Sequence, residues 1–339
     1  MRYTQWIAGV FLMLGAPGAS ADVPQVATDI GPVQSLVARV MDGVGTPDLI
    51  IRPGASPHGY ALRPSEARAL QQADLVVWMG EGLTPWMVKP IRTLAGQAQQ
   101  IELLEVAGTH VLPLRAHGAD MDHDHGHGHV EEHEDHDDEG HEDHVEDNHE
   151  GDAHDDESHD GEGHDDHGTF DTHAWLNPDN ARIWLRPIAD ELARLDPDNA
   201  AAYRVNADAA AAELHSLTEE IAATLAPVRD IPFVSFHDAY HYFEDRFGLV
   251  SAGTVSPGDA TDPSPAQLAA LRDRIRANGV TCAFSEPQFD PALLRTASGD
   301  RDVTIMQLDP LGSLLETGPA LYPDMLRAMA QTMAECLGQ

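Results

Sequence analysis

Short apolar runs alternate with helical stretches in both halves of the chain. In the first half, an apolar run at 49–51 is followed by a helical stretch at 65–72 and a second run at 75–79. A strand, a helix and a strand in this order predict a parallel crossover. The second half repeats the alternation in five further segments, 232–236, 239–247, 267–277, 280–285 and 303–308. The pattern therefore predicts an α/β fold with parallel sheets.

The middle of the chain predicts a single long helix. Residues 200–225 are rich in alanine and contain neither glycine nor proline, a composition that favours one uninterrupted helix. Two interpretations remain open: a core helix of one large domain, or a helix that joins two α/β lobes with a cleft between them. The chain order favours the second. The expected parts are an N-terminal lobe at 22–198, a linking helix at 199–228 and a C-terminal lobe at 229–339.

A histidine-rich, acidic insert interrupts the first lobe at 117–168. Between His117 and His167, 14 of the 20 histidines lie among 23 aspartates and glutamates. A segment with so little to bury is expected to be disordered. Neutral imidazoles suit zinc, copper, nickel and iron, whereas carboxylates alone suit calcium or magnesium. We expect the insert to bind transition-metal ions weakly, and an inert acidic linker is the alternative.

Residues 1–21 are typical of a signal peptide. Arg2 is followed by an apolar stretch at 6–14, too short to span a bilayer, and by the small residues Ala19-Ser20-Ala21. Cleavage there starts the mature chain at Asp22, and no later run is apolar enough for a membrane helix. We therefore expect export to the periplasm of a Gram-negative bacterium.

The chain contains two cysteines, Cys282 and Cys336. In an oxidising periplasm they are a natural disulfide pair, and two buried free thiols are the alternative. Their wide spacing argues against a zinc–cysteine site.

The net charge narrows the possible partners. It is −37 for the whole chain, and the body outside the insert is also acidic. Because an anionic surface repels the phosphate backbone, no nucleic-acid partner is expected. Nothing in the sequence indicates an oligomer, so we expect a monomer.

Three histidines outside the insert lie where α/β folds gather ligands. His58 lies in the loop after the first strand, and His173 precedes a helix that can start at Pro178. His237 ends a strand and precedes Asp238, a possible helix N-cap. Open α/β sheets bind ligands at such junctions. A lone loop histidine is more often a surface residue, yet three imidazoles and a fourth oxygen ligand would make a tetrahedral zinc site.

Five segments of the chain match a known family in sequence. They are SPHGYALRPSEARALQQADLVVWMGEGLTPWM at 56–87, THAWLNPDNAR at 172–182, FVSFHDAYHYFEDRFGL at 233–249, TCAFSEPQF at 281–289 and LDPLG at 308–312. They resemble the zinc-specific substrate-binding proteins of bacterial high-affinity zinc ABC transporters, the ZnuA type of the cluster A-I metal-binding family. The resemblance covers the whole mature chain and includes the insert. It implies two parallel-sheet α/β lobes, one long rigid helix joining them, and Zn2+ in the interlobe cleft.

The resemblance also implies which residues bind the metal. It assigns His58 and His173 from the first lobe and His237 from the second as zinc ligands. It also pairs Cys282 with Cys336. Manganese-binding relatives have a carboxylate at the position of His237, and an imidazole there favours zinc over manganese.

The fourth ligand is the point where the chain departs from the family. Some members have a glutamate directly before the first histidine, whereas this chain has Pro57, which cannot coordinate a metal. Asp309 follows a second-lobe strand and matches a carboxylate ligand of the manganese relatives. Asp309 and water are therefore the two alternatives. Glu286 is expected to support the site or the fold without binding the metal.

Three functions follow as competing hypotheses. The resemblance implies a solute-binding protein, not an enzyme, that captures Zn2+ and delivers it to an inner-membrane ABC permease for zinc import. A periplasmic zinc buffer or chaperone that never docks is the first alternative. A zinc hydrolase is the second, because His237-Asp238-x-x-His241 resembles the H-E-x-x-H helix of zinc proteases with Asp in place of Glu.

Overall fold

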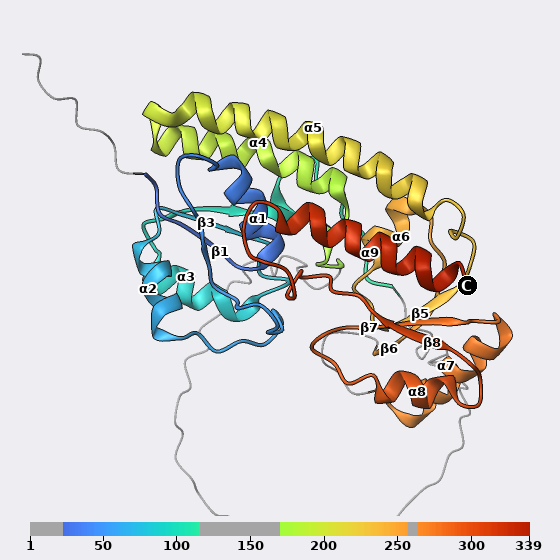
Figure 1. Ribbon diagram of the computed structural model, residues 1–339. Coiled ribbons are helices and arrows are strands. Elements are labelled where there is room, and N and C mark those ends of the chain that lie inside the picture. The colour runs from blue at the N-terminus through green and yellow to red at the C-terminus, as the bar shows by residue number, and fades with distance from the viewer. Residues whose placement is uncertain (1–22, 116–169, 257–262) are drawn as a thin grey trace, which may run out of the picture.

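The computed structural model describes residues 23–115, 170–256 and 263–339. It contains two four-stranded sheets, one in each of two lobes, with a layer of long helices running along both (Figure 1). The predicted signal peptide and the predicted insert lie outside the described residues. In the part of the chain that is described, no helix is both long and apolar enough to cross a membrane.

The first lobe is built on a parallel sheet in the order β2-β1-β3-β4. Its strands are β1 (Val26–Thr28), β2 (Asp48–Leu49), β3 (Leu75–Trp78) and β4 (Gln99–Glu102). In β3, Leu75 and Val77 pack into one apolar cluster, and Val76 and Trp78 pack into another. Both faces of this sheet are therefore covered, which explains why β3 is a continuous apolar run in the sequence.

The second lobe repeats the plan in the order β6-β5-β7-β8, again with parallel neighbours. Its strands are β5 (Phe233–His237), β6 (Ser251–Ser256), β7 (Cys282–Ser285) and β8 (Thr304–Gln307). The strand order reverses between β5 and β7. A crevice opens beyond the carboxyl ends of the strands at such a reversal, and ligands bind there in open α/β sheets.

Nine α-helices of the described residues surround and join the two sheets. They are α1 (Gly31–Val40), α2 (Pro64–Gln72), α3 (Val88–Leu94), α4 (Pro178–Leu195), α5 (Ala200–Leu225), α6 (His241–Phe247), α7 (Pro265–Ala277), α8 (Ala292–Ser298) and α9 (Leu321–Leu337). The long helix α5 has the predicted bounds, because an alanine-rich segment without glycine or proline offers no earlier stop. The predicted strands and helices lie within a residue or two of their observed positions.

A layer of α1, α4, α5 and α9 connects the lobes (Figure 1). The hairpin of α4 and α5 runs along both lobes, and α9 crosses back at the end of the chain to pack on α5 and α1. One apolar cluster extends from Val77 in β3 through Leu214 in α5 to Phe284 in β7. The prediction of two parallel-sheet lobes joined by a long helix is confirmed. Because this core is continuous and close-packed, we expect it to limit movement of one lobe against the other.

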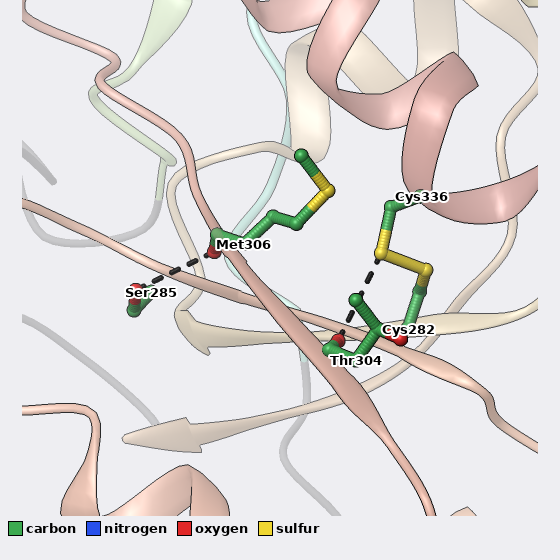
Figure 2. Close-up of a disulfide and its surroundings, with 5 residues drawn as sticks. All are labelled: Cys282, Ser285, Thr304, Met306 and Cys336. Carbon is green, nitrogen blue, oxygen red and sulfur yellow. Dashed lines mark hydrogen bonds between the residues drawn. A yellow bond between two sulfur atoms is a disulfide. The ribbon is translucent and has the colours of Figure 1, made fainter.

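Cys282 in β7 and Cys336 in α9 form a disulfide, with 5.9 Å between their Cα atoms (Figure 2). Both residues are buried in the second lobe. The pairing agrees with the one expected for an oxidising compartment, and it uses both cysteines of the chain. The bond fastens the last helix of the connecting layer to the second sheet.

One local prediction is wrong, because Asp238 does not cap α6. The helix begins at His241, with Tyr240 in the cap position. Asp238 instead forms an ion pair with Arg115, with 2.9 Å between Asp238 Oδ1 and Arg115 Nη2. Arg115 is half-buried, and a guanidinium that is partly removed from water is stabilised by a carboxylate partner.

Candidate metal centre

His58 is carried by the loop between β2 and α2 of the first lobe. The backbone beside it is fixed at Pro57, whose carbonyl oxygen accepts a hydrogen bond from Trp86 Nε1 at 2.7 Å. The His58 amide donates to Ser56 Oγ at 3.3 Å. His58 is half-buried, so it is more accessible than the two other candidate ligands.

His173 comes just before the short helix η3 (Ala174–Leu176), which leads into α4. Trp175 in η3 is buried, and its Nε1 donates to the Pro310 carbonyl oxygen at 2.8 Å. The Tyr322 hydroxyl, at the start of α9, donates to the Trp175 carbonyl oxygen at 2.6 Å. The loop after β8 and helix α9 therefore hold the turn that positions His173.

His237 is the last residue of β5, a central strand of the second sheet. All five residues of this strand are buried, and Ser235 Oγ donates to the His237 carbonyl oxygen at 3.0 Å. The side chain therefore projects from a rigid element into the crevice where the strand order reverses.

The three imidazoles meet between the lobes. Among the described residues, His58, His173 and His237 form a group in which one nitrogen of each lies within 4.8 Å of the others. The Nε2 atoms of His173 and His237 are 3.4 Å apart. Two nitrogens bound to one tetrahedral zinc ion at about 2.0–2.1 Å would be about 3.3 Å apart. This pair therefore already has the spacing of two zinc ligands.

Two buried carboxylates determine which nitrogen each imidazole can offer. His173 Nδ1 lies 2.7 Å from Asp171 Oδ1, and His237 Nδ1 lies 2.6 Å from Glu286 Oε1. Because a carboxylate only accepts hydrogen bonds, each Nδ1 carries the proton and donates it. The lone pair of each imidazole is then on Nε2, the atom that faces the other histidine.

Asp171 is ionised in this setting. Burial acts to raise the pKa of its carboxyl, but the positive charge that His173 carries when protonated, together with hydrogen bonds from His173 and His241, lowers the pKa below its usual range. Asp171 is not among the site residues predicted from the sequence. Its only signal in the sequence is its position two residues before His173, which also lets Asp171 Oδ1 accept from the His173 amide at 3.0 Å.

Asp309 lies outside the three-histidine group. Its Oδ1 accepts from the Leu311 amide at 3.2 Å, and its Oδ2 accepts from Ser313 Oγ at 2.9 Å and the Leu314 amide at 3.0 Å. Both oxygens therefore organise the loop that follows β8. Glu286, in contrast, contacts a candidate ligand directly.

The histidines of the protease-like pattern do not share a helix. His237 ends β5, whereas His241 begins α6, so they cannot project together from one helical face as H-E-x-x-H requires. His241 Nδ1 lies 3.5 Å from Asp171 Oδ2 instead. Asp238, which would act as the general base, pairs with Arg115. The hydrolase arrangement is therefore not formed by these residues.

The described residues that flank the insert lie beside the centre. Pro113 and Phe170 form an antiparallel bridge, so residues on either side of the insert are neighbours. The Tyr242 hydroxyl accepts from the Leu112 amide at 2.9 Å and donates to the Asp171 carbonyl oxygen at 2.6 Å. Tyr242 of α6 thus joins the described segments before and after the insert, next to the carboxylate that contacts His173.

Comparison with known proteins gives a consistent result. The family model ZnuA, described as zinc-uptake complex component A, periplasmic, matches residues 26–336. The chain is 46% identical over 339 residues to the high-affinity zinc uptake system protein ZnuA of Paracoccus denitrificans, covering 100% of this chain and 99% of that protein. It is 42% identical over 314 residues to the protein of the same name from Brucella suis, covering 93% of this chain and 92% of that protein. A crystal structure of a ZnuA deletion mutant with zinc bound shares the fold, with a TM-score of 0.68 and 22% identity over 93% of this chain and 98% of that chain.

Proposed function

The chain belongs to the ZnuA family of periplasmic zinc-uptake components, and from this premise we propose that it captures Zn2+ between its lobes and delivers it to an inner-membrane ABC permease. In this proposal the protein works in the periplasm as a solute-binding protein, and zinc is its cargo. The names of its relatives support the proposal, since those from Paracoccus denitrificans and Brucella suis are both named as high-affinity zinc uptake proteins.

The observation that carries the proposal is the meeting of three imidazoles from different parts of the chain. His58, His173 and His237 offer ligand atoms within 4.8 Å of one another, and an ion bound by all three would connect the lobes. Imidazole nitrogen suits zinc and its neighbours in the transition series, whereas magnesium, calcium and manganese prefer oxygen ligands. We assign these three histidines as the zinc ligands.

We propose water as the fourth ligand, with Asp309 as the competing candidate. Both Asp309 oxygens already accept hydrogen bonds within their own loop, and a zinc site with three protein ligands and a water is common. Asp309→Ala should therefore leave the zinc affinity unchanged. Asp309→Asn is the matched variant, because it keeps one oxygen acceptor for the loop. A large loss of affinity in both variants would make Asp309 a ligand.

The proposal also covers the parts of the chain outside the described residues. Residues 1–21 direct export, and the insert at 117–168 collects zinc ions near the centre without forming the transport site. The mature protein acts as a monomer with lobes at 22–198 and 229–339 and a linking helix at 199–228. It performs no chemistry on the metal.

Delivery to the permease separates this function from zinc buffering. Vesicles that contain the purified permease and ATP should take up radioactive zinc when the zinc-loaded protein is present. His237→Ala should abolish this stimulation, whereas His215→Ala should not, because His215 lies exposed on α5. A buffer would lower uptake to the level set by free zinc, and that outcome would reject delivery.

A further inference from the structure

Two carboxylates lie in the centre but are not among the proposed zinc ligands. Asp171 lies behind His173, and Glu286 lies behind His237, each within 2.7 Å of the imidazole Nδ1 atom. Glu286 is fully buried, and Asp171 is 3% exposed. They come from different segments, since Asp171 precedes η3 and Glu286 directly follows β7. The same arrangement has therefore been built twice around one site.

The two buried carboxylates can balance the positive charge of a bound zinc ion. Three imidazoles and a water are neutral ligands, so the first ring of atoms around a zinc ion leaves its two positive charges uncompensated. His173 and His237 are both buried, and a charge held away from water is unfavourable unless an opposite charge lies close by. Asp171 and Glu286, as carboxylates, bring two negative charges to within one imidazole ring of the ion.

Other charged groups nearby do not replace these two carboxylates. Arg115 forms ion pairs with Asp238 at 2.9 Å and with Glu244 at 2.8 Å. His241 shares Asp171 through the second carboxylate oxygen, at 3.5 Å. The Asp309 carboxylate accepts hydrogen bonds from Ser313 and Leu314 in the loop that follows β8. Asp171 and Glu286 each contact a ligand imidazole through a short hydrogen bond.

We infer that Asp171 and Glu286 are positioning residues that supply the counter-charge for the cargo and orient the Nε2 atoms of His173 and His237 toward it. This inference rests on the proposed zinc site. Each carboxylate increases the electron density that its imidazole offers to the metal. Together they make a set of neutral ligands selective for a doubly charged ion, with neither carboxylate touching the ion.

The amide variants Asp171→Asn and Glu286→Gln test the inference. An amide oxygen can still accept from Nδ1, so the geometry is retained while one negative charge is removed. Each variant should bind Zn2+ about 10–100-fold more weakly, the usual effect of losing a partner that hydrogen-bonds a metal ligand. Asp196→Asn is the control, because Asp196 is also fully buried and accepts from Tyr203 at 2.8 Å, but lies at the turn between α4 and α5. It should bind zinc as the unmodified protein does.

The visible spectrum of bound Co2+ separates a charge effect from simple misfolding. At saturating Co2+, both amide variants should show the tetrahedral spectrum of the unmodified protein, because the ligands themselves are unchanged. The two variants act on different histidines, so either one that folds is sufficient. Zinc affinities within about twofold of the unmodified protein, or a changed Co2+ spectrum, would overturn the inference. If the unmodified protein had no tight zinc site at all, the proposed function would fail instead.

Discussion

His173 and His237 form a rigid pair, whereas His58 lies on a loop. The pair is 6% and 5% exposed, and a buried carboxylate contacts the Nδ1 atom of each imidazole. His58 is half-buried in the segment between β2 and α2, where the Trp86 hydrogen bond to Pro57 fixes the backbone beside it. The difference suggests a division of labour, in which the pair defines the coordination geometry and His58 completes it.

This division suits a protein that must release its cargo. The continuous core of α1, α4, α5 and α9 resists separation of the lobes. A ligand on a loop can leave the ion with less disturbance than one at the end of a buried strand. We therefore expect zinc to enter and leave on the His58 side.

The largest expected effect follows removal of one member of the rigid pair. His237→Ala should weaken zinc binding by more than about 100-fold, the upper end for loss of a group that only hydrogen-bonds a ligand. It also leaves the buried Glu286 without its 2.6 Å partner, so the free energy of unfolding of the metal-free protein should fall by about 1–3 kcal/mol. Calorimetry with a competing chelator measures the first effect, and urea unfolding measures the second. Affinity within tenfold of the unmodified protein would contradict the prediction.

A smaller loss of affinity is expected for His58→Ala. The pair keeps its 3.4 Å Nε2 spacing, so the variant should retain a weakened site, and its zinc should dissociate faster than that of the unmodified protein. Stopped-flow transfer of zinc to a chromogenic chelator gives the dissociation rate. If His58→Ala lost as much affinity as His237→Ala, the proposed asymmetry would be wrong.

Acidification should act on all three imidazoles. A zinc ligand must be neutral, and a free imidazole has a pKa of about 6.5, so protons compete with zinc increasingly as the pH falls below that value. Affinity should fall by up to about tenfold per pH unit for each histidine that must lose a proton. His58→Ala should make this dependence less steep. Zinc titrations at a series of pH values from about 5 to about 7 measure this dependence, since the range includes the pKa of a free imidazole. An affinity that does not change at the acid end would contradict the prediction.

The smallest effect on zinc is expected from the disulfide. Replacing both Cys282 and Cys336 by serine should lower the free energy of unfolding by about 2–4 kcal/mol, because the bond joins α9 to β7. Zinc affinity should remain unchanged, because the disulfide secures the scaffold rather than the ligands. Denaturant unfolding and calorimetry on the same sample separate the two effects. A parallel loss of zinc affinity would mean that α9 positions the centre.

Much of the fold can be predicted from local sequence. Helix α5 has the predicted bounds because its propensity is uniform from Ala200 to Leu225, and β3 is recognisable because it is buried on both faces. Strand β1 was not predicted, because the three residues Val26–Thr28 are too few to show the alternation of apolar and polar residues that marks a strand. The prediction that Asp238 caps a helix is wrong because Asp238 forms an ion pair with Arg115, which lies before the insert in the sequence. This long-range contact cannot be read from the local sequence.

The residues of the metal centre could likewise be predicted only in part. The positions of His58, His173 and His237 at element junctions indicate candidate ligands, and the structure brings these three together. The carboxylates behind them could not be assigned from the sequence. His237 ends β5 and Glu286 directly follows β7, so their contact depends on the pairing of these two strands.

We assign the tight zinc site to the three imidazoles. Calorimetric titration of the mature protein with Zn2+ tests it most directly, with the triple variant His58→Ala, His173→Ala, His237→Ala beside the control His110→Ala, His215→Ala. We predict that the triple variant loses one tight site and keeps only weak binding, while the control, which removes two exposed imidazoles, keeps the tight site. Retention of the tight site in the triple variant would place it in the histidine-rich insert and contradict the account.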